Sequence, residues 1–163
     1  MLVIPELSSC KSKVKLAAVL LALCVADLAF AQGAAYVPGL GEIMSLQLMR
    51  HAKLWFAGKE KNWPLAAYEL DELKEGFEDA ARYHPSDDGV PIAQMIGAMT
   101  PGPMGELSAA IEHENGEAFA KSFDRLSAAC NTCHAGAKHG FIRIRRPRAS
   151  SFSNQDFTPR TRF

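Results

Sequence analysis

The chain has 163 residues, with 18 acidic side chains balanced by 18 lysines and arginines, so its formal net charge is zero. This length is enough for one domain with a hydrophobic core. The sequence contains no internal repeat, no glycine-rich phosphate loop and no nucleophile elbow. It therefore carries no motif for a repeat architecture, for nucleotide phosphate binding or for serine hydrolysis.

Residues 1–31 have the organisation of a secretory signal peptide. Three lysines precede the mostly apolar run Leu16–Phe30, which ends in Ala29-Phe30-Ala31 with small residues at the two positions that determine cleavage. The run is short for a membrane-spanning helix. We expect cleavage after Ala31 and export to the bacterial periplasm, without stable membrane insertion afterwards; an uncleaved anchor is the alternative.

Cleavage changes the cysteine content of the protein. Cys10 and Cys24 would leave with the signal peptide, and Cys130 and Cys133 would be the cysteines of the 132 remaining residues. The mature chain then has no disulfide framework, although export places it where disulfides form. A nucleic-acid partner is not expected for an exported protein.

Residues 40–58 are predicted to form the first helix of an all-α domain. Its apolar stripe lies opposite a charged face that carries Glu42, Arg50 and Lys53. The stripe consists of Met44, Leu48, His51 and Trp55. His51 lies at the centre of this stripe, so we expect it to be buried.

A second helix is predicted to run from the N-cap Asn62 to about Tyr83, with Pro64 in its first turn. Its buried seam is expected to be Ala66, Leu70, Leu73, Phe77 and Ala80. The other faces are acidic, and we expect Glu69, Asp71, Glu72, Glu75, Glu78 and Asp79 to be solvated there. A docking patch for a basic partner is the second interpretation of this acidity.

The third element is expected to be broken. A helix over 91–99 stops at Thr100-Pro101-Gly102-Pro103 and resumes to about Glu114. Met95, Met99 and Met104 flank the break and are expected to fill the core. The last helix opens at Asn115-Gly116, turns Phe119, Phe123 and Leu126 inward, and ends at Gly136 and Gly140.

The last helix carries the pentapeptide Cys130-Asn131-Thr132-Cys133-His134, which is the attachment sequence of a c-type haem. The cysteine thiols form thioethers with the haem vinyl groups, and the histidine supplies the proximal iron ligand. The alternatives are a redox Cys-x-x-Cys or a zinc site that also uses His139. We expect one haem c per chain, with His134 as the proximal iron ligand and His51 as the distal ligand; Met44 is the alternative distal ligand.

The chain continues beyond the motif as a basic, extended tail. Residues 135–163 carry 7 basic and 1 acidic side chains, whereas residues 42–134 carry 15 acidic and 8 basic ones. The predicted domains are thus a signal peptide over 1–31, a haem-binding bundle over 32–139 and a tail over 140–163. Three phenylalanines in the tail are unusual for a disordered segment. The tail therefore either wraps the body or covers a haem edge, or it is a frayed terminus.

Four helices, a haem sequence on the last and a distal face on the first resemble the class II c-type cytochromes, the cytochrome c′ group. The specific part of the resemblance is Cys130, Cys133 and His134. It implies an antiparallel four-helix bundle with a haem between the helices, and in many members a homodimer. In that group the first helix supplies the residue that faces the distal side of the iron, which corresponds here to the Met44–His51 stripe.

The expected function is electron transfer with redox partner proteins, by an electron carrier rather than an enzyme. Two strong axial ligands would keep the iron low-spin in both oxidation states. The alternative is a five-coordinate protein that binds or senses nitric oxide or carbon monoxide. A peroxidase is the third hypothesis, and the sequence shows no evident partner for His51 as its acid–base group.

Overall fold

The structure is a computed structural model that describes residues 36–160. Contacts divide the chain into two units, residues 1–37 and 38–163. Of the first unit only Tyr36 and Val37 are described, in irregular backbone, so the predicted signal peptide lies outside the described residues.

Every described helix belongs to the second unit. The helices are α2 (Leu40–Lys59), α3 (Trp63–Tyr83), α4 (Ile92–Met99), α5 (Pro101–Glu112) and α6 (Gly116–Gly136). Between residues 36 and 160 there is no β-strand, only an isolated bridge between Asp87 and Val90. The all-α class predicted from the sequence is therefore confirmed.

Asparagine side chains cap α3, at the predicted Asn62, and α6, at Asn115, where the sequence predicted that the helix opens. The Asn62 carboxamide oxygen accepts a hydrogen bond from the Leu65 N–H, and that of Asn115 accepts one from the Ala118 N–H. Each bond satisfies one of the amide hydrogens that have no partner inside the first turn of a helix.

The break in the third element is smaller than predicted. Thr100 is the one residue between α4 and α5, and it keeps right-handed helical angles of φ −92° and ψ −35°. Its carbonyl accepts from the Met104 N–H at 3.1 Å, and its hydroxyl donates to the Ile96 carbonyl at 3.0 Å. Pro101 starts α5 without loss, because the first amide of a helix needs no intrahelical acceptor.

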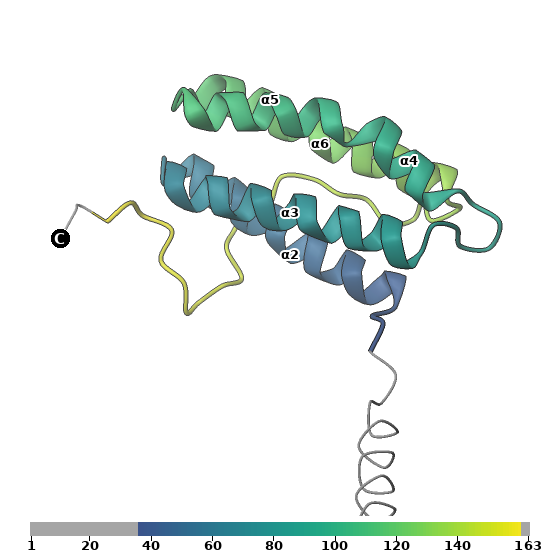
Figure 1. The fold of residues 1–163 in the computed structure, drawn as a ribbon. Helices are drawn as coiled ribbons and strands as arrows, with labels where there is room; N and C mark the ends of the chain where they lie inside the picture. The colour runs from purple at the N-terminus through teal and green to yellow at the C-terminus, as the bar shows by residue number, and fades with distance from the viewer. Residues whose placement is uncertain (1–35, 161–163) are drawn as a thin grey trace, which may run out of the picture. The chain divides into compact units, whose positions relative to one another are not determined.

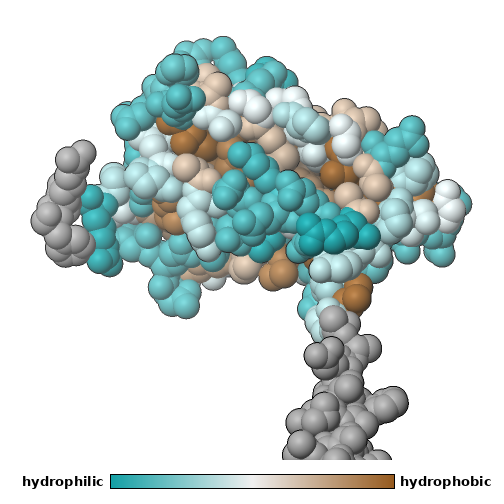
Figure 2. All heavy atoms as spheres, in the orientation of Figure 1, coloured by the Kyte–Doolittle hydropathy of each residue, from teal (hydrophilic) through white to brown (hydrophobic). Residues whose placement is uncertain are grey.

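The helices pack as a closed set of neighbours (Figure 1). Helix α2 lies against α3 and α6, and α3 and α6 each lie against the α4–α5 element. Helices α2 and α3 run in opposite directions, α4 and α5 continue one another, and α6 runs back beside that pair. In the same view, hydrophilic residues gather over the middle of α3 (Figure 2).

The predicted inward faces of α3 and α6 are part of the core. Ala66, Leu70, Leu73 and Ala80 of α3 and Phe119, Phe123 and Leu126 of α6 are all buried. Gly58 of α2 allows close contact with α6, because a Cβ at this position would collide with the Phe119 ring. Gly76 of α3 leaves space for the Gln47 side chain of α2, because a Cβ at position 76 would collide with it.

Two predictions about burial are wrong, one for Leu48 and one for Glu69. Leu48 is 54% exposed, and the buried stripe of α2 instead runs through Ile43, Gln47, His51 and Leu54. Glu69 was expected on the solvated face of α3 but is only 3% exposed, with Lys53 Nζ at 4.0 Å. Burial raises the pKa of Glu69, and Lys53 opposes that shift. Both errors arise because α2 and α3 pack through polar as well as apolar positions.

The end of α6 also differs in detail. The helix ends at Gly136 as predicted, but the residue with left-handed angles is Lys138, at φ 63°, and not a glycine. The described tail then packs on the helical body, as one of the two predicted alternatives required. Phe157 is 7% exposed, with its ring centroid 5.5 Å from that of Phe56, and Asn62 donates to its carbonyl at 3.2 Å.

Phe157 is expected to hold the end of the tail by burying its ring. Phe157→Ala should lower the free energy of unfolding by about 3 kcal/mol, because it leaves a cavity beside Phe56. Chemical denaturation of the full-length mature protein measures this. Phe141→Ala is the matched control, since Phe141 is 79% exposed and its loss should change stability by less than about 0.5 kcal/mol. Equal effects of both changes would contradict the prediction.

Candidate haem-binding site

The two cysteines of the pentapeptide continue the inner stripe of α6. Leu126, Cys130, Cys133 and Ala137 follow one another at steps of four, three and four residues, which places them on one face of the helix. All four border one cavity, as does His134. Cys130 and Cys133 are free and half-buried. The helix thus presents two thiols and one imidazole to the same space.

The cavity has a volume of about 590 Å³ and lies among the helices. Most of its wall is apolar and comes from α2, α3, α4 and α6, with Ile142 and Ile144 of the tail completing it. This volume is within the range of about 300–1,000 Å³ that is usual for ligand and cofactor sites. An apolar wall with a few convergent polar groups suits a flat hydrophobic cofactor.

The two thiols lack the lowered pKa values of a reactive cysteine pair. Burial raises the pKa of Cys130 to about 11, with a smaller contribution from Cys133, and burial also raises the pKa of Cys133. Both residues lie near the C-terminal end of α6, where the helix dipole disfavours a thiolate. Reactive Cys-x-x-Cys pairs instead have lowered pKa values. The redox alternative therefore gains no support from the site.

His134 uses its outer ring nitrogen in a hydrogen bond to the tail. Nδ1 lies 3.2 Å from the Ile142 carbonyl oxygen. A carbonyl can only accept, so Nδ1 carries the hydrogen, and in the neutral imidazole Nε2 has the lone pair. Metal-bound histidines commonly have this arrangement, with the second nitrogen donating to a carbonyl or carboxylate.

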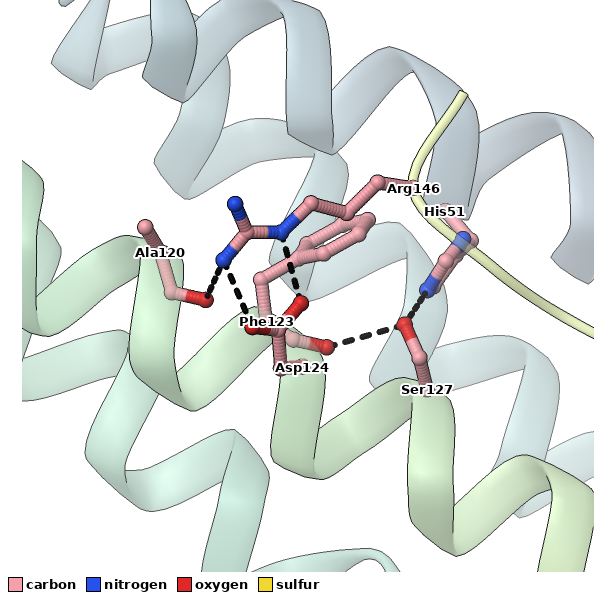
Figure 3. A network of polar contacts seen from close by, with 6 residues as sticks. All are labelled: His51, Ala120, Phe123, Asp124, Ser127 and Arg146. Atoms are coloured by element: carbon pink, nitrogen blue, oxygen red, sulfur yellow. Dashed lines mark hydrogen bonds and ion pairs between the residues drawn. The ribbon is translucent and has the colours of Figure 1, made fainter. Parts of the chain in front are cut away.

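His51 of α2 is buried, as predicted, and borders the same cavity, but its Nε2 already has a partner (Figure 3). Nε2 lies 2.9 Å from Ser127 Oγ, and that hydroxyl donates to the Phe123 carbonyl at 2.9 Å. Since the serine has given its hydrogen to Phe123, His51 Nε2–H is the donor in the other bond. Binding a metal through Nε2 would require this bond to break.

Burial also determines the charge of His51. It lowers the pKa of the imidazole to about 4, so the side chain is neutral at pH 7. Its ring lies beside that of Phe123, with centroids 4.3 Å apart. The distal-ligand assignments of His51 and of its alternative Met44 stay predictions, and both residues border the cavity.

Several wall residues were not anticipated as part of a site. Met95 and Met99 of α4 border the cavity, whereas Met104 is the buried core residue that the sequence predicted. Ile142 and Ile144 also border it. Their signal was present in the sequence Ile-Arg-Ile-Arg, since such alternation places the apolar side chains of an extended segment on one side.

Within residues 36–160, no group of three or more His, Cys, Asp and Glu side chains is placed to hold a metal ion, and so the zinc alternative finds no such cluster there. In the same part of the chain, no helix has both the length and the apolar character needed to cross a membrane. No family model, curated protein or solved structure matches the chain.

The buried neutral His51 is expected to make stability depend on pH. Its pKa is lower in the folded state, so the unfolded chain binds more protons as the pH falls from about 6.5 towards 4, and stability is lost over that interval. The free energy of unfolding should fall by about 2 kcal/mol between pH 7 and pH 5 from this group alone.

Denaturation of wild type and His51→Gln at both pH values measures this contribution. The variant should lose that part of the pH dependence. His113→Gln is the control because His113 is exposed, and its pH dependence should match the wild type. An unchanged pH dependence in His51→Gln would refute the prediction.

Proposed function

We propose that this chain is an exported c-type cytochrome, with one haem c bonded to Cys130 and Cys133 and held by His134. We further propose that its helices form the antiparallel four-helix bundle of the class II c-type cytochromes. One observation carries the proposal: both thiols and the imidazole border a single, mostly apolar cavity that is lined mainly by helices. The donor set and the cavity together fit a covalent haem.

We propose electron transfer as its activity. A bound haem would supply an iron centre that accepts and releases one electron. The apolar wall would limit the access of water to this centre, and His134 offers the lone pair of its Nε2. His51 and Met44 border the same cavity and are the candidates for the second axial position. Two strong axial ligands would limit reorganisation when the oxidation state changes.

The proposed location is the bacterial periplasm, after removal of residues 1–31. Its partners would be redox proteins, and the exposed acidic residues of α3, such as Asp71, Glu75 and Glu78, are a candidate contact surface for a basic one. A homodimer, which the class II resemblance implies, is part of the proposal.

A specific observation favours a second candidate, binding of a small gas. His51 Nε2 donates to Ser127 Oγ, and a bond of this kind would hold the imidazole away from the iron. If it persists in the loaded protein, the distal side stays open to nitric oxide or carbon monoxide. The hydrogen bond between His51 and Ser127 therefore distinguishes the two functions. If it is kept, it favours gas binding, and if it breaks, Nε2 of His51 can bind the iron.

Covalent attachment is tested by the intact mass of the protein produced with c-type maturation. The mass should equal that of residues 32–163 plus one haem. Changing both Cys130 and Cys133 to alanine should abolish all covalent haem, whereas Thr132→Ala should keep it, because Thr132 is exposed and bonds only to the Ala128 carbonyl. Stoichiometric zinc in place of haem would refute the proposal. A membrane-bound chain that still begins at Met1 would refute the cleavage.

The distal ligand is tested by optical spectra of both oxidation states. If His51 binds the iron, His51→Ala should convert a low-spin haem to high-spin and open a site for carbon monoxide, while Met44→Leu should leave the spectrum unchanged. The reverse pattern would assign the position to Met44. A native protein that is already high-spin, with no effect of either change, would favour gas binding.

A further inference from the structure

Residues 141–146, here called the strap, run back along α6 after the haem motif. It contains neither helix nor strand, and its apolar side chains Ile142 and Ile144 border the same cavity as Cys130 and Cys133. The Ile142 carbonyl accepts the hydrogen bond from His134 Nδ1. The strap thus contacts the site through two residues, Ile142 and Ile144.

Asn131 holds the middle of the strap. This residue lies inside the pentapeptide, yet its carboxamide bonds to the backbone of Ile144 in both directions. Nδ2 donates to the Ile144 carbonyl at 2.9 Å, and Oδ1 accepts from the Ile144 N–H at 2.7 Å. Two bonds to one residue fix both its position and the orientation of its peptide groups.

Arg146 holds the far end of the strap (Figure 3). Its guanidinium donates to both carboxylate oxygens of Asp124 at 2.6 Å and to the Ala120 carbonyl at 2.9 Å. It also lies over the Trp55 ring, 4.6 Å from the centroid. A bidentate pair with a third bond and a cation–π contact is stronger than an ordinary surface ion pair.

We propose that the strap is a positioning device for His134, and that it lowers the reduction potential of the haem. This inference rests on the proposed function. With Ile144 and Arg146 anchored, the Ile142 carbonyl is held as the acceptor for Nδ1–H, and the imidazole is fixed in the tautomer that leaves Nε2 to the iron. A histidine that donates in this way is a more basic ligand. A more basic ligand stabilises ferric over ferrous iron.

The expected effect can be measured as a reduction potential in the haem-loaded, full-length mature protein. Asn131→Ala removes both bonds to Ile144, so the carbonyl of Ile142 loses its support. The relative stabilisation of ferric iron should fall about tenfold, the lower end of the effect of losing such an outer partner. Tenfold corresponds to a rise in potential of about 59 mV for a one-electron couple.

Two controls separate positioning from general destabilisation. Thr132→Ala changes the neighbouring motif residue, whose hydroxyl donates to the Ala128 carbonyl of α6, and should leave the potential unchanged. Phe157→Ala weakens the packing of the tail beyond the strap and should lower the melting temperature without moving the potential. Asp124→Ala removes the anchor of Arg146 and should raise the potential by less than Asn131→Ala. If Asn131→Ala fails to take up haem, the potential of Asp124→Ala shows by itself whether the strap affects the haem.

The outcomes are distinguishable. A wild-type chain without covalent haem overturns the proposed function itself. If the wild-type chain carries haem, and neither Asn131→Ala nor Asp124→Ala changes its reduction potential, the strap proposal alone is overturned. A potential that moves as much in Phe157→Ala as in Asn131→Ala also overturns it, since the effect would then follow from stability.

Discussion

The packing of the aromatic face of α6 against α2 determines where the site lies. The Phe123 ring is 4.3 Å from the His51 imidazole and 4.9 Å from the Trp55 indole, measured between centroids. Gly58 allows the Phe119 ring to touch the α2 backbone. These contacts set the distance between α2 and α6, which both line the cavity. A larger residue at position 58 would push α2 and α6 apart. Its Cβ would collide with the Phe119 ring, which has little space to move in a close-packed core.

Buried polar groups give this packing its register. Gln47 donates to the Leu73 carbonyl at 2.7 Å between α2 and α3, and His51 donates to Ser127 between α2 and α6. In the described part of the chain, no buried side-chain nitrogen or oxygen lacks a hydrogen-bond partner. An unsatisfied buried group costs about 1–3 kcal/mol, so a slip of either helix would be penalised. His51, which borders the cavity, is thus also part of the contact between α2 and α6.

The tail joins the site to the rest of the fold. Arg146 bonds to Asp124, one residue after the Phe123 carbonyl that accepts from Ser127 (Figure 3). His51 and His134, which both border the cavity, are therefore held from the same stretch of α6, His51 through Ser127 and His134 through the strap. This arrangement makes α6 the element that positions both of these histidines, and it gives the basic tail a structural reason to follow the motif.

Local signals in the sequence determined the helices, their asparagine caps and the pentapeptide, because periodicity, capping and covalent attachment depend on residues a few positions apart. They also placed His51 on an inner face. Tertiary structure alone decided which polar residues are buried, as Glu69 and Gln47 show, since burial depends on the neighbouring helix. It also decided that Ser127 bonds to His51 and that Asn131 and His134 hold the strap. These partners are 76, 13 and 8 residues apart, so only the folded chain brings them together.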